Sequence, residues 1–68
     1  MKIKYFEDSD TALLEFADRK IEETIEVNEN IYLDLDKDGN IVNITVEHAK
    51  ENTNLPTLSY EEITKEVA

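Results

Sequence analysis

Hydrophobic and polar residues alternate along most of the chain up to position 46. A period of two is typical of β-strands, in which successive side chains point to opposite faces of a sheet. The pattern predicts five strands, near residues 3–5, 12–16, 21–27, 31–36 and 41–46. Alternation in every strand favours an antiparallel sheet with one buried face, because the strands of parallel sheets tend to be apolar throughout. The predicted apolar face comprises Ile3, Tyr5, Ala12, Leu14, Phe16, Ile21, Ile25, Val27, Ile31, Leu33, Leu35, Val42, Ile44 and Val46.

The polar segments between these strands have lengths that keep the apolar residues in phase. Loops at residues 7–10, 28–30 and 37–40 connect paired strands, and Asn and Gly within them tolerate the left-handed backbone of tight turns. The expected opposite pairs are Ile3 with Leu14, Tyr5 with Ala12, Ile25 with Leu33, Val27 with Ile31, Leu33 with Ile44, and Leu35 with Val42.

The alternation stops after Val46, and a helical pattern begins near Ser59. Ser59 and Glu62 form a capping box, while Leu58 and Ile63 occupy the positions of a hydrophobic staple. The apolar stripe of this helix would comprise Tyr60, Ile63 and Val67. We predict a helix from Ser59 to Val67 that packs on the sheet or on a partner. The expected fold is therefore α+β, an antiparallel sheet with a short C-terminal helix, in one domain of residues 1–68.

Asp34, Asp36 and Asp38 stand at alternate positions before Gly39. This spacing is similar to the start of an EF-hand loop, which also needs a bidentate glutamate at its twelfth position and a helix on each side. Here the twelfth position is Thr45, and both flanks alternate as strands. Asp-Lys-Asp-Gly suits a type I turn followed by a left-handed glycine. We predict a plain hairpin turn without a metal; weak binding of a divalent ion at these carboxylates is the alternative.

The amino-acid composition limits the classes of partner that we expect for this protein. The 68 residues include 17 acidic and 7 basic side chains, for a net charge of −10. Such an excess repels phosphate backbones, so we expect no nucleic-acid partner. The N-terminus has no apolar signal core and the chain has no run of about 18 apolar residues, so we expect a cytoplasmic protein without a membrane partner. A single glycine gives no phosphate-binding glycine-rich loop, and we expect no cofactor.

The chain is also short, and it has no cysteine to form a disulfide. Chains of this size have little core, and oligomerisation is a common remedy. Phe6, Leu13 and Tyr32 point away from the predicted core face, which would leave apolar area exposed. We therefore predict a homodimer, the alternative being that loops or the C-terminal helix cover these residues.

The predicted partner-facing residues are Glu22, Glu26, Phe6 and Leu13. Glutamates at alternating strand positions are typical of a solvated face, and that is the simpler interpretation of Glu22 and Glu26. In an acidic protein such a face can also guide a basic partner through complementary charge.

His48, the only histidine, follows Glu47 just beyond the last predicted strand. Imidazole titrates near neutral pH and suits acid–base chemistry. A catalytic histidine also needs a nucleophile, a substrate pocket or an orienting partner, and the sequence identifies none of these. We expect a structural or surface role and assign no catalytic residue; His48 and Glu47 remain candidates for function.

Four segments, taken together, carry a family resemblance: "IKYF", "DTALLEF", "NENIYLDLDKDGNIVNITVEHA" and "PTLSYEE", in this order. The chain resembles the short prokaryotic proteins of domain of unknown function 2283. Ala12-Leu13 stands where relatives tend to carry Leu-Tyr, which affects the size of the side chains packed there. The resemblance implies a bacterial or archaeal domain of unassigned activity, with no catalytic residues to transfer. It also implies that Val46–Ala49 is a recurrent structural feature.

Charge, size and the lack of a catalytic motif favour a small acidic protein–protein interaction module over an enzyme. Such a module would bind a basic protein partner, as antitoxin-like or inhibitor-like proteins do. Two alternatives stay open: a minor enzyme or metal-dependent site around His48, and a structural homo-oligomer.

Overall fold

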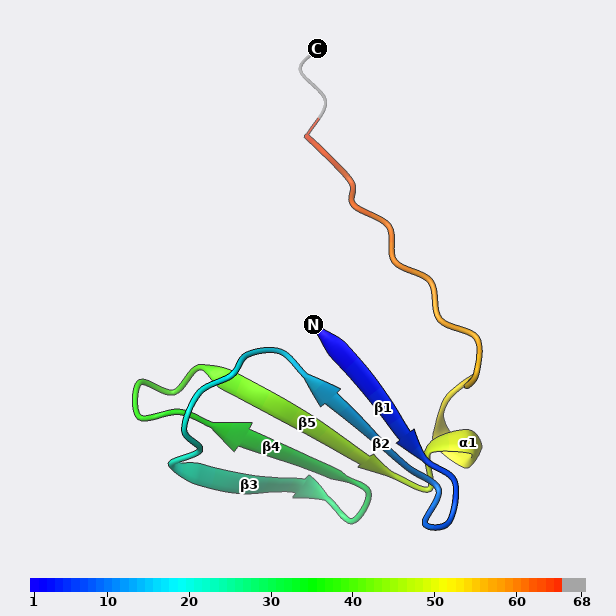
Figure 1. Ribbon diagram of the computed structural model, residues 1–68, viewed down its shortest axis with the longest axis horizontal. Helices are drawn as coiled ribbons and strands as arrows, with labels where there is room; N and C mark the ends of the chain where they lie inside the picture. The colour runs from blue at the N-terminus through cyan, green and yellow to red at the C-terminus, as the bar shows by residue number, and fades with distance from the viewer. Residues whose placement is uncertain (66–68) are drawn as a thin grey trace.

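The computed structural model describes residues 1–65, which form one antiparallel sheet and one short helix (Figure 1). The elements are β1 (Lys2–Phe6), β2 (Thr11–Glu15), β3 (Glu23–Asn28), β4 (Ile31–Leu35), β5 (Ile41–Glu47) and α1 (Ala49–Asn52). The strand order is β1-β2-β5-β4-β3, so β5 is central and β1 and β3 are the edges. The predicted fold class, α+β with a five-stranded antiparallel sheet and a short helix, is confirmed. Across residues 1–65, no helix combines the length and the apolar character needed to cross a membrane.

The loop lengths set the register largely as predicted. The pairs Ile3 with Leu14, Tyr5 with Ala12, Ile25 with Leu33, and Leu33 with Ile44 all form. Leu14 also pairs with Ile44 where β2 meets β5. One apolar row therefore crosses all five strands, in the order Ile3, Leu14, Ile44, Leu33 and Ile25.

Two predicted pairs are wrong because each hairpin contains a register shift. Asn28, not Val27, pairs with Ile31, and the irregularity leaves Val27 54% exposed. Leu35 pairs with Ile41 rather than Val42, because the register shifts between Asp34 and Leu35. A bulge places two residues opposite one, so a count of loop residues alone misses it.

The connection from β2 to β3 runs past the ends of β5 and β4 and is fixed there by backbone hydrogen bonds. The Phe16 N–H donates to the Val42 carbonyl at 2.8 Å, and the Glu22 N–H donates to the Leu35 carbonyl at 2.8 Å. This path places β3 at the far edge, from which β4 and β5 return by two hairpins to the centre of the sheet.

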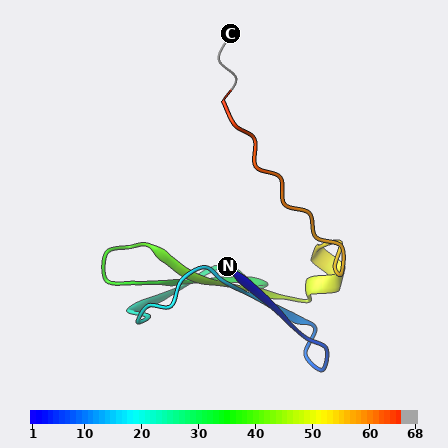
Figure 2. The same cartoon turned by 45° about the horizontal axis from the view of Figure 1, so that its top comes forward.

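The sheet is a single layer, seen nearly edge-on in Figure 2. Packing between elements joins mainly neighbouring strands. Within residues 1–65 the buried apolar residues are Ala12, Val42 and Ala49, and no large side chain is fully buried. In this part of the chain, α1 lies over one corner of the predicted core face and no second layer covers the rest.

The solvent-accessible surface of the chain is larger than that of a compact protein of the same mass. The chain exposes 5744 Å², whereas a compact monomer of 7.9 kDa exposes about 4400 Å². The radius of gyration is 14.2 Å, against about 11 Å for a compact chain of this length. The uncovered sheet and residues 53–65, which turn at 54–57 and then lead away from the sheet, both contribute to this excess of about 1300 Å².

The short helix lies earlier in the chain than predicted. It is α1, directly after β5, whereas residues 59–65 form no helix and residues 66 and 67 lie outside the described part of the chain. A helix of nine residues is marginal in water unless its apolar stripe packs on something. Leu58, Tyr60 and Ile63 are 65%, 80% and 83% exposed, so these three residues pack on nothing within residues 1–65.

Candidate functional site

The apolar face of the sheet is a candidate binding surface. We call the central row, Ile3, Leu14, Ile44, Leu33 and Ile25, together with its neighbours Tyr5, Ala12, Val46 and Ile31, the apolar face. Its exposure rises toward the β3 edge, where Ile25 is 38% exposed. An uncovered apolar patch rimmed by polar residues is typical of a protein-interaction surface.

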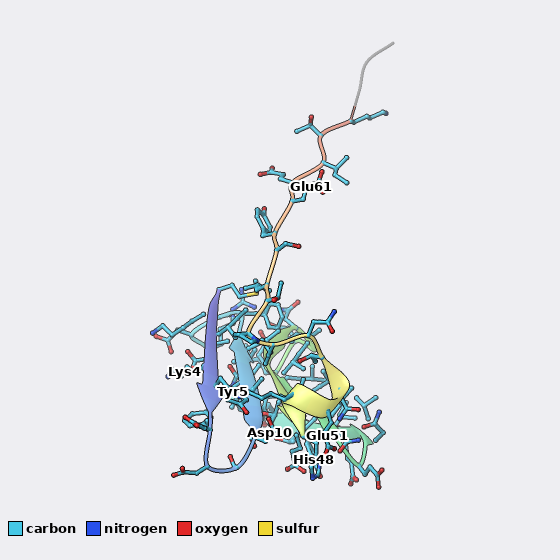
Figure 3. The ribbon with its side chains drawn as sticks, turned by 90° about the vertical axis from the view of Figure 1, so that its right-hand side faces the viewer. Lys4, Tyr5, Asp10, His48, Glu51 and Glu61 are labelled. Carbon is cyan, nitrogen blue, oxygen red and sulfur yellow. The ribbon has the colours of Figure 1, made fainter. Side chains whose placement is uncertain are left out.

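Helix α1 lies over one corner of this face. The Lys50 ammonium stands 5.2 Å from the centre of the Tyr5 ring, and the Ala49 side chain is fully buried. The chain that follows α1 therefore leaves from the apolar side of the sheet. It extends away from the strands, as Figures 1 and 3 show, with Glu61 far from the labelled residues of the sheet.

The opposite face of the sheet, which we call the polar face, is acidic over β3, β4 and β5. Glu26 pairs with Tyr32, and the charges of Glu47 and Glu26 raise the pKa of the Tyr32 phenol. On β1 this face carries Lys4, which pairs with the Glu15 carboxylate at 3.0 Å. The negative potential is thus concentrated away from the β1 edge.

The predicted partner-facing residues are spread over this polar side. Leu13 pairs with Lys4, and Phe6 ends β1 and is exposed, as predicted. Glu26 lies in β3, while Glu22 is exposed just before this strand begins. Phe6 and Leu13 lie in β1 and β2, whereas Glu22 and Glu26 lie at the far β3 edge, so the four residues do not form one patch.

Asp10 ties α1 to the first hairpin, and its role was not predicted from the sequence (Figure 3). Its carboxylate accepts hydrogen bonds from the Tyr5 hydroxyl at 2.5 Å and from the Lys50 backbone N–H at 3.1 Å. Its carbonyl accepts the Ala49 N–H at 2.8 Å. The bond to Tyr5 is the largest cause that lowers the pKa of Asp10, and the same bond raises the pKa of Tyr5 to about 12.

His48 forms the corner between β5 and α1. Its backbone is left-handed, with φ of 52° and ψ of 47°, a conformation that histidine adopts more readily than most residues other than glycine, asparagine and aspartate. Its exposed ring has Nδ1 3.0 Å from the Asn30 side-chain oxygen, in an open hollow that Glu29, Glu51 and Asn52 also line. This contact orients the ring at the corner between β5 and α1.

Glu47 ends β5 and takes part in the sheet through its backbone. It pairs with Thr11, and its N–H donates to the Asn30 carbonyl at 2.7 Å. Its carboxylate contributes to the negative field at Tyr32 rather than to a bond with His48.

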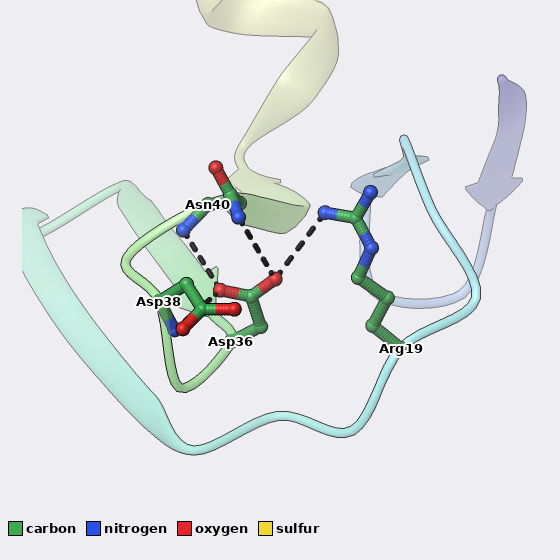
Figure 4. Close-up of polar contacts among 4 residues, drawn as sticks. All are labelled: Arg19, Asp36, Asp38 and Asn40. Atoms are coloured by element: carbon green, nitrogen blue, oxygen red, sulfur yellow. Dashed lines mark hydrogen bonds and ion pairs between the residues drawn. The ribbon is translucent and has the colours of Figure 1, made fainter.

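The aspartate segment forms the predicted turn (Figure 4). The Asp36 carboxylate accepts the backbone N–H groups of Asp38 and Asn40, each at 2.9 Å, and Gly39 has the expected left-handed φ of 83°. Arg19 lies 3.2 Å from the same carboxylate. The bond from Asn40 is the largest cause that lowers the pKa of Asp36. Strands β4 and β5 flank the turn, which is the hairpin arrangement and not that of an EF-hand.

Asp34 and Asp36 make separate contacts. The Asp34 carboxylate accepts the Thr24 hydroxyl at 2.7 Å and the Asn43 amide at 3.3 Å, so it belongs to the polar face. Among residues 1–65, no group of three or more His, Cys, Asp or Glu side chains has the geometry to hold a metal ion.

Comparison with known proteins gives one match. The model of a family described as protein of unknown function (DUF2283) matches residues 2–50, which span all five strands and the start of α1. The match ends before "PTLSYEE" at residues 56–62, which also carries the resemblance noted in the sequence. No curated protein and no solved structure matches the chain. Since the matched residues make up most of the chain, the protein belongs to this family of unknown function.

Proposed function

We propose that this protein is a small acidic protein–protein interaction module that works as a homodimer. The observation that carries the proposal is the uncovered apolar face: a row of five apolar residues crosses a single-layer sheet and meets no second layer. A sheet that packs on one side needs a cover of apolar side chains about 10 Å away. A second copy supplies such a surface.

The area available fits a stable interface. Specific complexes bury about 800 Å² per partner, and the excess surface of this chain is about 1300 Å². This excess, to which the sheet and residues 53–65 both contribute, is larger than the area that one partner buries in an interface of standard size. A dimer that covers the apolar face would also supply the core that a cysteine-free chain of this size lacks.

The homodimer can be tested with a matched pair of variants in β3. Ile25→Thr removes apolar area from the apolar face and Glu26→Thr changes the polar face, while both place the same strand-forming residue in one exposed strand. We expect Ile25→Thr to weaken the dimer roughly tenfold and Glu26→Thr to leave it nearly unchanged. Sedimentation equilibrium measures both constants. Equal constants for the two variants would remove the apolar face from the interface.

The polar face is the surface that we propose for a basic partner. The negative field of Glu26 and Glu47 around Tyr32 supports this assignment, as does the net charge of −10. Complementary charge raises association rates and loses range as salt is added, from about 10 Å at 0.1 M to about 3 Å at 1 M ionic strength. The site of action that we propose is the cytoplasm, and cell fractionation would check it.

Charge reversal tests the basic partner. The double variant Glu22→Lys and Glu26→Lys leaves Ile21 and Ile25 in place, so the sheet should persist at little cost. The control reverses Glu7 and Asp8, which are exposed in the β1–β2 loop, and gives the same net charge. A partner captured by the wild type from lysate should be basic and should associate more slowly with the β3 double variant than with the control. Equal rates at low salt would show that the β3 side of the polar face is not the recognition surface.

A further inference from the structure

Within residues 1–65, two apolar surfaces are largely uncovered, and they complement each other. One is the apolar face, and the other is the stripe Leu58, Tyr60 and Ile63 on residues 53–65, which we call the arm. The arm leaves α1 on the apolar side of the sheet, because α1 lies against Tyr5 there. It then extends away from its own sheet (Figures 1 and 2).

We propose that the arm of one protomer docks as a helix on the apolar face of a second copy, so that two arms are exchanged in the homodimer. The proposal rests on the homodimer proposed above and names the segment that makes its interface. Exchange of identical segments gives a closed two-fold dimer in which each contact occurs twice.

The dimensions agree with this arrangement. Residues 53–58 link α1 to the start of the proposed helix at Ser59 and reach at most about 20 Å, and less than that because the Thr57 N–H donates to the Asn54 carbonyl in a turn. The described part of such a helix, Ser59 to Lys65, is about 10 Å long, and adjacent strands are about 4.8 Å apart. One such helix therefore covers about three of the five strands.

The local sequence explains why the arm is extended in a single chain. Ser59 and Glu62 supply a capping box, and Leu58 and Ile63 a staple, so the start of a helix is encoded. A helix this short is marginal until its apolar stripe is buried. Docking would supply that burial, so the arm folds as it binds.

A spin-label experiment on mixed chains tests the exchange directly. The natural chain has no cysteine, so a Lys65→Cys chain takes one spin label, whereas the isotope-labelled wild type in the same mixture takes no spin label. We expect the label to broaden the amide signals of Leu14, Ile44 and Leu33 in the wild-type chain. Lys37→Cys, on the β4–β5 turn, is the control with the same charge change, and it should leave this row sharp.

In a second mixture the Lys65→Cys chain carries the isotope and the wild type, in excess, does not. Broadening of the same row only in this second mixture would mean that the arm folds back on its own sheet, and would overturn the exchange. Absence of broadening in both samples would overturn it too, because the arm would then contact neither sheet.

A substitution in the arm gives an independent measure of how much the arm contributes to the dimer. Ile63 is 83% exposed, so Ile63→Ser cannot unfold the sheet of its own protomer, and Thr64→Ser is the matched control. Ile63→Ser should weaken the dimer roughly a hundredfold, because each dimer loses about tenfold at two sites. It should also lower the helix content, whereas Thr64→Ser should change neither.

Sedimentation of the same samples separates the two proposals. A wild-type dimer that Ile63→Ser leaves intact would overturn the arm exchange and leave the homodimer standing, with the two sheets packed face to face. A monomeric wild type would overturn both.

Discussion

Substitutions at His48 can separate the role of its backbone from that of its ring. An L-residue in the left-handed region pays about 1–2 kcal/mol, and a β-branched side chain fits there worst. At φ of 52°, His48→Gly releases this strain, adds about 0.5–1 kcal/mol of chain entropy and loses the contact of the exposed ring with Asn30, so the net change should be small. His48→Val keeps the strain, adds crowding and loses the contact with Asn30, for a total cost of about 2 kcal/mol.

The assay is thermal unfolding followed by circular dichroism at one fixed protein concentration, because the stability of an oligomer depends on concentration. A cost of about 2 kcal/mol lowers the Tm of a domain this small by roughly 8–16 °C. We therefore expect a loss of that size for His48→Val and a change of at most a few degrees for His48→Gly. His48→Asn is a second control, because asparagine also tolerates the left-handed region. If glycine destabilises the protein as much as valine does, the imidazole contact matters and the explanation from backbone conformation is wrong.

Two further predictions concern pH. Because its pKa is raised to about 12, the Tyr5 phenol should contribute stability that is complete below about pH 10 and is lost as pH rises through 12. Ultraviolet titration of Tyr5→Phe should lack the tyrosine that ionises near pH 12. An unchanged titration would contradict the assignment of this raised pKa to Tyr5. The lowered pKa of Asp36 should add stability that is present above about pH 4 and is lost as pH falls through the folded-state value. Asp36→Asn should therefore be less stable than wild type at pH 7 and lose less on acidification, and parallel acid-unfolding curves for the two proteins would contradict this cause.

The central row of the sheet could be predicted because two local signals agree there. Alternation assigned Ile3, Leu14, Ile44, Leu33 and Ile25 to one face, and the loop lengths brought them into register. The register shifts beside Val27 and near Val42 were missed, because a bulge leaves the alternation on either side nearly intact.

The arm and Asp10 show a different limit of prediction from sequence. The capping box at Ser59 marks where a helix can begin, but whether the helix forms depends on a surface that the local pattern does not contain. Asp10 meets the Lys50 backbone 40 positions along the chain, and no spacing rule connects the two. An aspartate just before a strand was the only local signal, and it is typical of many ordinary turns.

Sedimentation equilibrium of the full chain at high micromolar concentration tests most directly whether a second copy covers the apolar face. We expect a species of twice the chain mass of 7.9 kDa, which dissociates on dilution and is weakened by Ile25→Thr but not by Glu26→Thr. A single species of 7.9 kDa at the highest concentration would contradict the homodimer.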